Sequence, residues 1–487
     1  MTLPPSPPPP PPPPAAPPGR LVLPALRWRD DTGFGHEAPA IETALRFGAG
    51  GFILFGGTAD LVAELTARLR RDAGRPLLIA ADLERGPGQQ VRGLDELPPP
   101  RALAALGEPA VLRGAGVLTA VEALSVGINW VLAPVADLDT EPENPIVQTR
   151  AFGEAPARTA AAVAAWIVGC EAAGALACAK HFPGHGRTRT DSHLQLPVVS
   201  AEAAVLRAED LEPFRAAVAA GVGSVMTAHV AYPALDPTGA AATFSRPILD
   251  ILRRELGFEG LIVSDALMME GARAGRTAAV AALLALNAGV DLLLYPDDPA
   301  GVAAALELAA QADPRVGRRV EEALARYHAA LRTVVTDELP ERLPPAGSVT
   351  ALADWLLAEP LLRGEPPRLT APLELIVVDD DQGGPWPASP NTWLRDTLVA
   401  RGVPLGPGGS RIVLAFAEPR ASKGRAGFGA ESLAALGRDA PGAAVVLLFG
   451  HPRLGDAIPS GPAVLLAWHR QRLMQEAVAR WLVARLS

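Results

Sequence analysis

Three of the eight histidines lie within one stretch of fourteen residues, KHFPGHGRTRTDSH, at 180–193. The stretch begins with Lys180, one of only two lysines in a chain that otherwise uses arginine for its positive charge. An ammonium group is a compact donor of three hydrogen bonds, whereas the guanidinium group of arginine is a planar fork. We therefore expect Lys180 to have a specific binding role.

The end of this stretch, TDSH, places Asp191 two residues before His193. On a turn, this spacing lets a carboxylate orient a neighbouring imidazole and stabilise its charged form. Asp191 could equally cap the loop while His193 packs, and the local pattern leaves both interpretations open. The Pro-Gly sequence between His181 and His185 precludes a regular helix, so these two histidines cannot form a helical zinc pair.

The elements that would position these residues are eight short apolar runs, separated by amphipathic or alanine-rich segments. Each run has the length of a strand that is buried on both faces. Eight strands that alternate with helices over residues 20–337 predict a (β/α)₈ TIM-type barrel of the α/β class. A doubly wound open sheet is the alternative, but no strand is followed by a GxGxxG turn. The runs are 20–26, 50–55, 76–82, 128–137, 175–181, 223–229, 260–265 and 290–296.

Titratable residues stand where five of these runs end. In a barrel of this type the active site lies at the carboxyl ends of the strands. Any one of these residues could cap a helix, but five strand ends that point into one bowl predict an active site. The aspartate that ends GLIVSD could be a general base, a metal ligand or a nucleophile. The residues are Asp82, Asp137, Lys180 with His181, His229 and Asp265.

The rest of the chain is interpreted as three further regions. Residues 1–19 are proline-rich, which predicts a disordered tail in polyproline II conformation. This segment lacks the basic start and apolar stretch of a signal peptide, so we expect a cytoplasmic location. Residues 338–347 are interpreted as a linker, and residues 348–487 as a smaller, sandwich-like α/β domain because strands and helices alternate again.

Composition argues against several classes of partner. The formal net charge of −9 argues against a surface that binds nucleic acid. Two cysteines cannot form a disulfide framework. Residues 160–179 have nearly the length of a membrane span, but Glu171 and Gly174 favour a buried helix, a turn and a short strand. We expect neither a nucleic-acid nor a membrane partner, and the oligomeric state is open.

The stretch KHFPGHG followed by TDSH resembles the signature of family-3 glycoside hydrolases, in particular their β-N-acetylhexosaminidase branch. The resemblance extends over residues 20 to about 335 and includes three further motifs. It implies an enzyme that acts on a carbohydrate substrate without a metal or an organic cofactor. The second α/β region is similar, more weakly, to a C-terminal domain that some members carry. The motifs are NWVLAPVADLD with ENPIVQTRAFG (129–153), MTAHVAYP (226–233) and LGFEGLIVSDALMMEGA (256–272).

The resemblance also implies residue roles. Asp265 matches the nucleophile of a retaining mechanism, which forms a covalent glycosyl-enzyme. His193 matches the general acid/base of the branch, with Asp191 as its partner. His229 is expected either to line the bowl or to be structural, and His185 to stabilise the loop. The residues that match those holding the sugar are Asp82, Arg150, Lys180 and His181.

One motif departs from the pattern of the branch. After the sugar-binding aspartate the branch usually reads DQEGGRV, whereas this chain has DLERGPGQQVRG at 82–93. Arg92 is the candidate for the arginine of that motif. The departure affects one wall of the sugar subsite and leaves the fine sugar specificity open.

Several rival functions stand beside a β-N-acetylglucosaminidase that acts on muropeptides. A family-3 β-glucosidase usually takes a glutamate acid/base from its second domain, whereas TDSH supplies a candidate within the barrel. Phosphorolysis is open, because a neutral base repels phosphate less than a carboxylate does. A metal-dependent hydrolase would need several ligands that converge on one ion. A non-catalytic sugar-binding protein would not need Asp265 together with Asp191 and His193.

Overall fold

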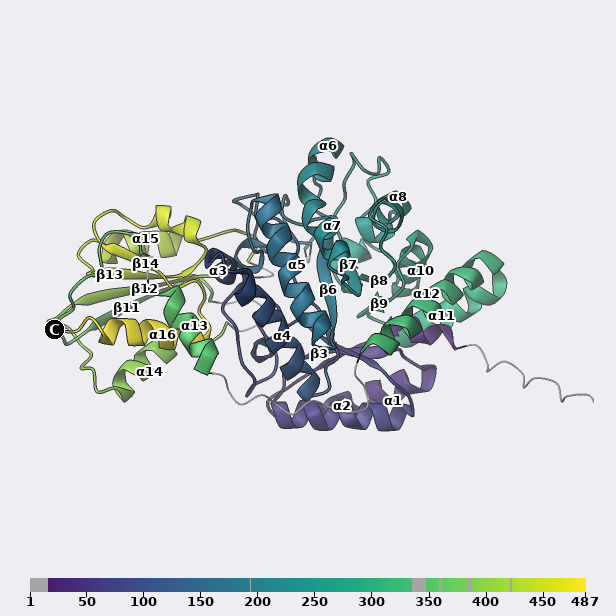
Figure 1. Ribbon diagram of the computed structural model, residues 1–487, viewed down its shortest axis with the longest axis horizontal. Helices are drawn as coiled ribbons and strands as arrows, with labels where there is room; N and C mark the ends of the chain where they lie inside the picture. The colour runs from purple at the N-terminus through teal and green to yellow at the C-terminus, as the bar shows by residue number, and fades with distance from the viewer. Residues whose placement is uncertain (1–15, 193, 335–346, 359–360, 383–387, 421–422) are drawn as a thin grey trace, which may run out of the picture.

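The computed structural model describes residues 16–192, 194–334, 347–358, 361–382, 388–420 and 423–487. Figure 1 shows two bodies side by side, a larger one with helices α1–α12 and a smaller one with helices α13–α16. The first is built on a curled parallel sheet, and the second on a separate five-stranded sheet.

The sheet of the larger body closes into a barrel. Strands β2 to β8 are paired in chain order, and β1 pairs in parallel with β9. A bridge between Val263 and Leu292 connects the β8 side of the sheet to β9, which completes the ring. The TIM-type barrel predicted from the apolar runs is thus confirmed. Its strands are β1 (Val22–Leu23), β2 (Ala25–Arg27), β3 (Gly51–Phe55), β4 (Leu78–Ala81), β5 (Trp130–Val131), β6 (Leu176–Phe182), β7 (Ser224–Thr227), β8 (Leu261–Ser264) and β9 (Leu293–Leu294).

Some predicted strands are less regular than their sequences suggest, and two of them show why. Pro24 divides the first run into β1 and β2, because proline has no N–H to donate to a ladder. The run 128–137 forms only a two-residue strand, after which Val135 makes an isolated bridge to Lys180. Both irregularities leave the ring closed.

Helices surround the barrel and join its strands. Helix α2, for example, ends at Gly74, whose φ of +62° is the left-handed conformation that commonly terminates helices. The helices are α1 (Ala38–Phe47), α2 (Ala59–Ala73), α3 (Pro100–Ala105), α4 (Pro109–Ser125), α5 (Pro156–Ala172), α6 (Ala203–Val205), α7 (Glu212–Ala219), α8 (Arg246–Asp250), α9 (Glu270–Arg273), α10 (Ala278–Ala288), α11 (Pro299–Ala312) and α12 (Pro314–Thr333).

The alanine-rich segment 160–179 is a buried helix, a turn and a strand, as predicted. Helix α5 ends at Ala172, and β6 starts at Leu176 after Gly174, whose φ is +90°. Across the part of the chain that the structure describes, no helix is both long and apolar enough to cross a membrane.

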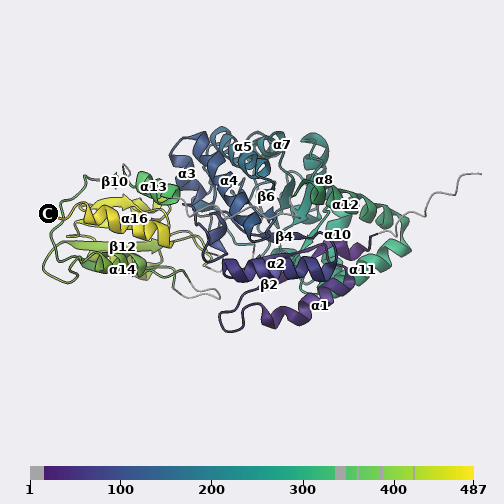
Figure 2. The ribbon, with the colours of Figure 1, turned by 60° about the horizontal axis from the view of Figure 1, so that its bottom comes forward.

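The smaller body has strand order β10-β14-β13-β12-β11, with β10 antiparallel to β14 and the other pairs parallel. Helix α16 packs against α13 and α14, and Figure 2 shows it lying alongside β12. The elements are α13 (Gly347–Leu356), β10 (Leu361–Arg363), β11 (Glu374–Asp379), α14 (Trp393–Ala400), β12 (Arg411–Ala417), α15 (Ala430–Asp439), β13 (Val445–Gly450), β14 (Ala463–Leu466) and α16 (Arg472–Val483).

The two bodies are in contact. The hydrophobic core of the smaller body includes Ala102 of α3, which belongs to the barrel side. Nε2 of Gln471 also donates a hydrogen bond to the carbonyl oxygen of Leu97 at 2.8 Å. The smaller body therefore docks beside the loop that follows β4, on the side where the carboxyl ends of the strands lie.

Two predicted regions fall largely outside the described residues. Of the proline-rich tail, residues 16–19 are described, and Pro18 and Gly19 form the start of a 3₁₀-turn (Pro18–Leu21) in which Gly19 is buried against Phe47. The structure thus places them with the barrel rather than with a tail. Of the linker proposed at 338–347, only Gly347 is described, as the first residue of α13.

Candidate active site

A cavity of about 600 Å³ opens at the carboxyl ends of the barrel strands. Asp82 directly follows β4, Lys180 and His181 lie in β6, and Asp265 directly follows β8. Ser192 brings the TDSH loop to the wall of the same cavity. The predicted site residues that line it are Asp82, Arg150, Lys180, His181 and Asp265.

Lys180 connects two carboxylates on this wall. Its Nζ donates a hydrogen bond to Oδ1 of Asp82 at 2.6 Å and lies 2.7 Å from Oε1 of Glu84. Burial by itself lowers the pKa of a lysine, but Asp82 and Glu84 together raise the pKa of Lys180. The ammonium group is therefore charged at neutral pH and held in place, which fits the specific role expected of it.

Glu84 is a site residue that the sequence analysis missed. Its carboxylate accepts two hydrogen bonds from Arg150, from Nε at 2.8 Å and from Nη2 at 2.7 Å. Although burial opposes it, Arg150 and Lys180 hold the pKa of Glu84 well below its usual range. The signal was present, because Glu84 follows Asp82 by two residues and side chains two residues apart along an extended chain share a face.

Asp137 orients His181. Its Oδ2 lies 2.7 Å from Nδ1 of His181, and its Oδ1 accepts hydrogen bonds from the backbone N–H groups of His181 and His185. Although burial opposes it, His181 and then His185 lower the pKa of Asp137. A carboxylate at Nδ1 directs Nε2 of His181 away from Asp137. Asp137 was identified as a strand end, but its role as the partner of His181 was not.

His185 stabilises the loop, as expected. Its Nδ1 lies 2.8 Å from Oγ1 of Thr188 and its Nε2 lies 3.1 Å from Oγ of Ser192. Burial lowers the pKa of His185 to about 4, so the ring is neutral at physiological pH. It connects the start of the 180–193 stretch to the residue that lines the cavity.

Asp191 and Ser192 of the TDSH stretch are buried beside the cavity. The carbonyl oxygen of Asp191 accepts hydrogen bonds from the N–H groups of Leu194 at 3.0 Å and Gln195 at 3.2 Å. The carbonyl oxygen of Ser192 accepts one from Gly271 of α9, which follows the β8 strand end. His193 lies outside the described residues, so its predicted role stays a prediction.

Two residues predicted to bind the sugar do not line the cavity. His229 is fully buried, with Nδ1 2.8 Å from Oγ1 of Thr243 and Nε2 3.2 Å from the carbonyl oxygen of Ala266. Of the two roles expected for His229, these contacts favour the structural one. The prediction for Arg92 is corrected, because it is exposed and pairs with Asp30 at 2.9 Å.

The smaller body completes one edge of the cavity with Pro419, Arg420 and His469. Among the described residues of that body, none that lines the cavity is acidic. The neighbouring Glu418 is buried, where its Oε1 accepts a hydrogen bond from the N–H of Arg470 at 2.6 Å. Burial, and then the charge of Asp381, raise the pKa of Glu418 to about 8. No local signal in the sequence could have assigned Arg420 or His469 to this site.

The described residues of the cavity do not form a ligand set for a metal ion. Within the described ranges, no group of three or more histidine, cysteine, aspartate or glutamate side chains is arranged to hold a metal ion. Asp82, Glu84 and Asp137 are instead engaged by lysine, arginine and histidine side chains.

The chain can now be compared with known proteins. Residues 44–328 match the family model of the glycosyl hydrolase family 3 N-terminal domain. A β-hexosaminidase of Pseudomonas aeruginosa is 42% identical over 264 residues, which cover 53% of this chain and 78% of that protein. The solved structure of a family-3 β-N-acetylglucosaminidase from a Paenibacillus species is similar over 96% of both chains, with a TM-score of 0.79 and 26% identity.

A β-glucoside phosphorylase also shares the fold, with a TM-score of 0.80 and 22% identity over 96% of this chain and 92% of that one. The barrel and the cavity at its carboxyl edge define a barrel enzyme, and the comparisons identify its class as glycoside hydrolase. The chain belongs to glycoside hydrolase family 3.

Proposed function

We propose that this chain is a retaining β-N-acetylglucosaminidase that releases terminal β-linked N-acetylglucosamine. The observation that carries the proposal is the shared cavity, in which Asp265 faces the same space as Asp82, Lys180 and His181. Carboxylates and cationic donors suit a ring of hydroxyl groups, because each hydroxyl both donates and accepts hydrogen bonds. The names of the relatives, β-hexosaminidase and β-N-acetylglucosaminidase, support the sugar.

In the proposed mechanism, a carboxylate oxygen of Asp265 attacks the anomeric carbon while the glycosidic oxygen leaves with a proton from His193. A water molecule then attacks the same carbon, gives its proton to His193 and releases Asp265. Asp191 would stabilise the charged imidazole. Proton transfer of this kind contributes a rate factor of about 10²–10⁴.

The sugar-holding roles rest on the network that the ion pairs form. Glu84, Arg150 and Lys180 fix one another, so their remaining donors and acceptors are presented to the cavity without reorganisation. Asp82 and His181 are the outer members of this network, tied to Lys180 and Asp137 respectively. We assign these residues to the N-acetylglucosamine subsite.

For the leaving group we propose the acidic partner sugar of a muropeptide. Arg420 lines the edge of the cavity that the smaller body completes, and Arg85 lines it from the barrel. Arg85 acts electrostatically on Glu418 and on His469, so its guanidinium group lies near the smaller body. Two guanidinium groups favour a carboxylate on the leaving group.

The test compares hydrolysis of aryl β-N-acetylglucosaminides and aryl β-glucosides, with and without phosphate. We expect preference for the N-acetyl sugar, release of the free sugar rather than its phosphate, and a loss of about 10⁴-fold or more in kcat for Asp265→Ala. His193→Ala should lose less with an activated leaving group, which needs little protonation. Faster glucoside hydrolysis, sugar phosphate as product, or an active Asp265→Ala protein would each refute the proposal.

A further inference from the structure

The smaller body reaches the barrel at a second place, away from the cavity edge. Nη2 of Arg453 donates a hydrogen bond to Oδ2 of Asp139 at 2.5 Å, and Nε2 of His451 lies 2.8 Å from the same oxygen. Arg453 also donates to two backbone carbonyl oxygens, those of Asp139 at 3.3 Å and Glu141 at 3.4 Å. The side chain of Asp139 is fully buried. Arg453 contacts the segment 139–141 through both its backbone carbonyl groups and the Asp139 carboxylate, and His451 contacts the same carboxylate.

The same segment holds the loop that leads to Asp191. The N–H of Glu141 donates to the carbonyl oxygen of Gly186 at 3.2 Å, and Nε of Arg189 donates to Oε2 of Glu141 at 2.9 Å. Asn144, which bonds back to the carbonyl oxygen of Glu141, donates to the carbonyl oxygen of His185 at 3.0 Å. The loop is thus attached to residues 139–144 by backbone and side-chain bonds.

The two segments approach too closely for a side chain at the point of contact. A Cβ atom at Gly186 would lie 1.7 Å from the carbonyl oxygen of Leu138, a distance that no packed structure allows. A displacement of the segment 138–141 must therefore move the backbone at residue 186, because there is no flexible side chain between them to absorb it.

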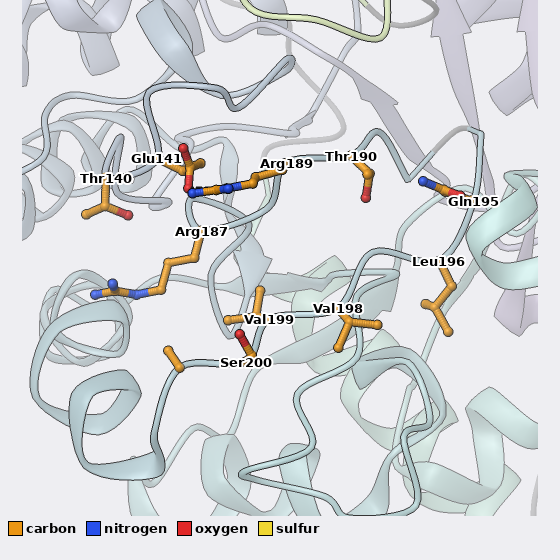
Figure 3. Close-up of a pocket in the computed structure, with 11 residues that line it drawn as sticks. Thr140, Glu141, Arg187, Arg189, Thr190, Gln195, Leu196, Val198, Val199 and Ser200 are labelled. Carbon is orange, nitrogen blue, oxygen red and sulfur yellow. Dashed lines mark hydrogen bonds and ion pairs between the residues drawn. The ribbon is translucent and has the colours of Figure 1, made fainter.

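A hollow lies on one side of this loop. This polar cavity of about 770 Å³ is lined by Glu141, Arg187, Arg189, Gln195, Leu196 and residues 198–201. Figure 3 shows Arg189 extended toward Glu141 across the top of this hollow, with Val198 to Ser200 on its opposite side. The bond between Arg189 and Glu141 joins the loop to the segment 139–141 at the rim of this hollow.

We propose that Arg453 and His451 of the smaller body are positioning residues for the acid/base loop of the barrel, acting through the segment 139–141. The inference rests on the proposed function for the roles of Asp191 and His193. The inference gives the smaller body a role in the reaction, although none of these contacts involves the substrate. Proton transfer needs the acid/base group within hydrogen-bond reach of the leaving oxygen, so a small displacement of the loop reduces this step selectively.

The test uses the full chain with Arg453→Gln, Arg453→Lys and the control Arg480→Gln. Arg480 is matched, because its Nε donates to Oδ1 of Asp354 at 2.9 Å and both residues belong to the smaller body. For Arg453→Gln we expect hydrogen exchange of residues 186–195 to become about tenfold faster. We expect kcat/KM for a phenyl β-N-acetylglucosaminide to fall about tenfold or more, and that for the dinitrophenyl glycoside to fall less than about threefold.

The control Arg480→Gln should change neither exchange in this segment nor the ratio of the two rates. Arg453→Lys keeps a positive charge beside Asp139 and should recover part of the loss. Equal losses with both substrates, or unchanged exchange of residues 186–195, would overturn the inference.

Glu141→Gln tests the other end of the connection if Arg453→Gln does not fold. It weakens the bond to Arg189, and it should speed exchange of residues 186–195 while leaving exchange in the smaller body unchanged. Unchanged exchange in both Glu141→Gln and Arg453→Lys would overturn the inference. A wild-type protein that hydrolyses no N-acetylglucosaminide would refute the proposed function instead. In that case the hydrogen exchange of residues 186–195 in the variants would still show whether Arg453 positions the loop.

Discussion

Glu84 and Arg150 form a bidentate ion pair on the wall of the cavity, with oxygen–nitrogen distances of 2.8 and 2.7 Å. The pair is shared with Lys180, whose Nζ lies 2.7 Å from the same carboxylate. Two cations on one buried carboxylate leave the group strongly dependent on its partners. We therefore expect the sugar subsite to be disturbed by a substitution that removes the charge of Glu84 and keeps the size of its side chain.

Glu84→Gln should both destabilise the protein and weaken substrate binding. The substitution keeps the size of the side chain but leaves the buried Lys180 and the half-buried Arg150 with one carboxylate fewer, which costs about 3 kcal/mol in the free energy of unfolding. KM for an aryl N-acetylglucosaminide should rise, since Arg150 and Lys180 lose their fixed positions. Denaturant unfolding and steady-state kinetics measure both effects. The matched control is Glu42→Gln, which breaks the exposed pair with Arg46 and should change the free energy of unfolding by less than about 0.5 kcal/mol.

Asp137→Asn should reduce activity by weakening binding of the sugar, because His181 is assigned to the sugar subsite. An amide can present its N–H₂ group to Nδ1 of His181, which favours the other tautomer of the neutral ring, so that Nε2 becomes a donor instead of an acceptor. The loss in kcat/KM should be about tenfold or more, which corresponds to about one hydrogen bond to the sugar. Kinetics with both aryl substrates measure it. Wild-type kcat/KM in a folded Asp137→Asn protein would contradict a role for the His181 tautomer.

Glu171→Gln should change how stability depends on pH. Burial raises the pKa of Glu171 to about 7, even though its Oε1 accepts hydrogen bonds from Ala177 and Gly223. Between pH 4.5 and 7 the folded state then binds more protons than the unfolded state, so this group lowers the stability as pH rises through that window. Glutamine does not titrate and so removes this pH dependence; the variant should gain about 3 kcal/mol in the free energy of unfolding over the wild type at pH 8 relative to pH 4.5. Unfolding curves at the two pH values measure the difference, and parallel pH profiles for the two proteins would contradict it.

Arg420→Gln should discriminate between leaving groups. If Arg420 faces the acidic partner sugar, KM for a carboxyphenyl β-N-acetylglucosaminide should rise about fivefold, which corresponds to about 1 kcal/mol. KM for the uncharged phenyl glycoside should stay within about twofold. High salt should reduce the difference in the wild type because it screens the interaction. The same change in KM for both substrates would argue against an acidic leaving group.

The barrel was predictable because its signals are local. Each buried strand appears as an apolar run, and the run 260–265 ends in the residue that later stands in the cavity. The interruption at Pro24 could also have been anticipated from the missing N–H. The side chains of His229 and Arg92 lie outside the cavity, since being close in sequence to the site says nothing of which way a side chain points.

The sequence by itself determined the order of strands, the charged groups at their ends and the resemblance of the 180–193 stretch to one family. Only the tertiary structure decided that Glu84 joins Arg150 to Lys180, that Asp137 holds His181, and that Arg420 and Arg453 of a distant segment reach the barrel. The physical reason is the range of the interactions. Periodicity and turn chemistry act over a few residues, whereas these contacts join residues tens to hundreds of positions apart and exist only once the ring closes and the two bodies dock.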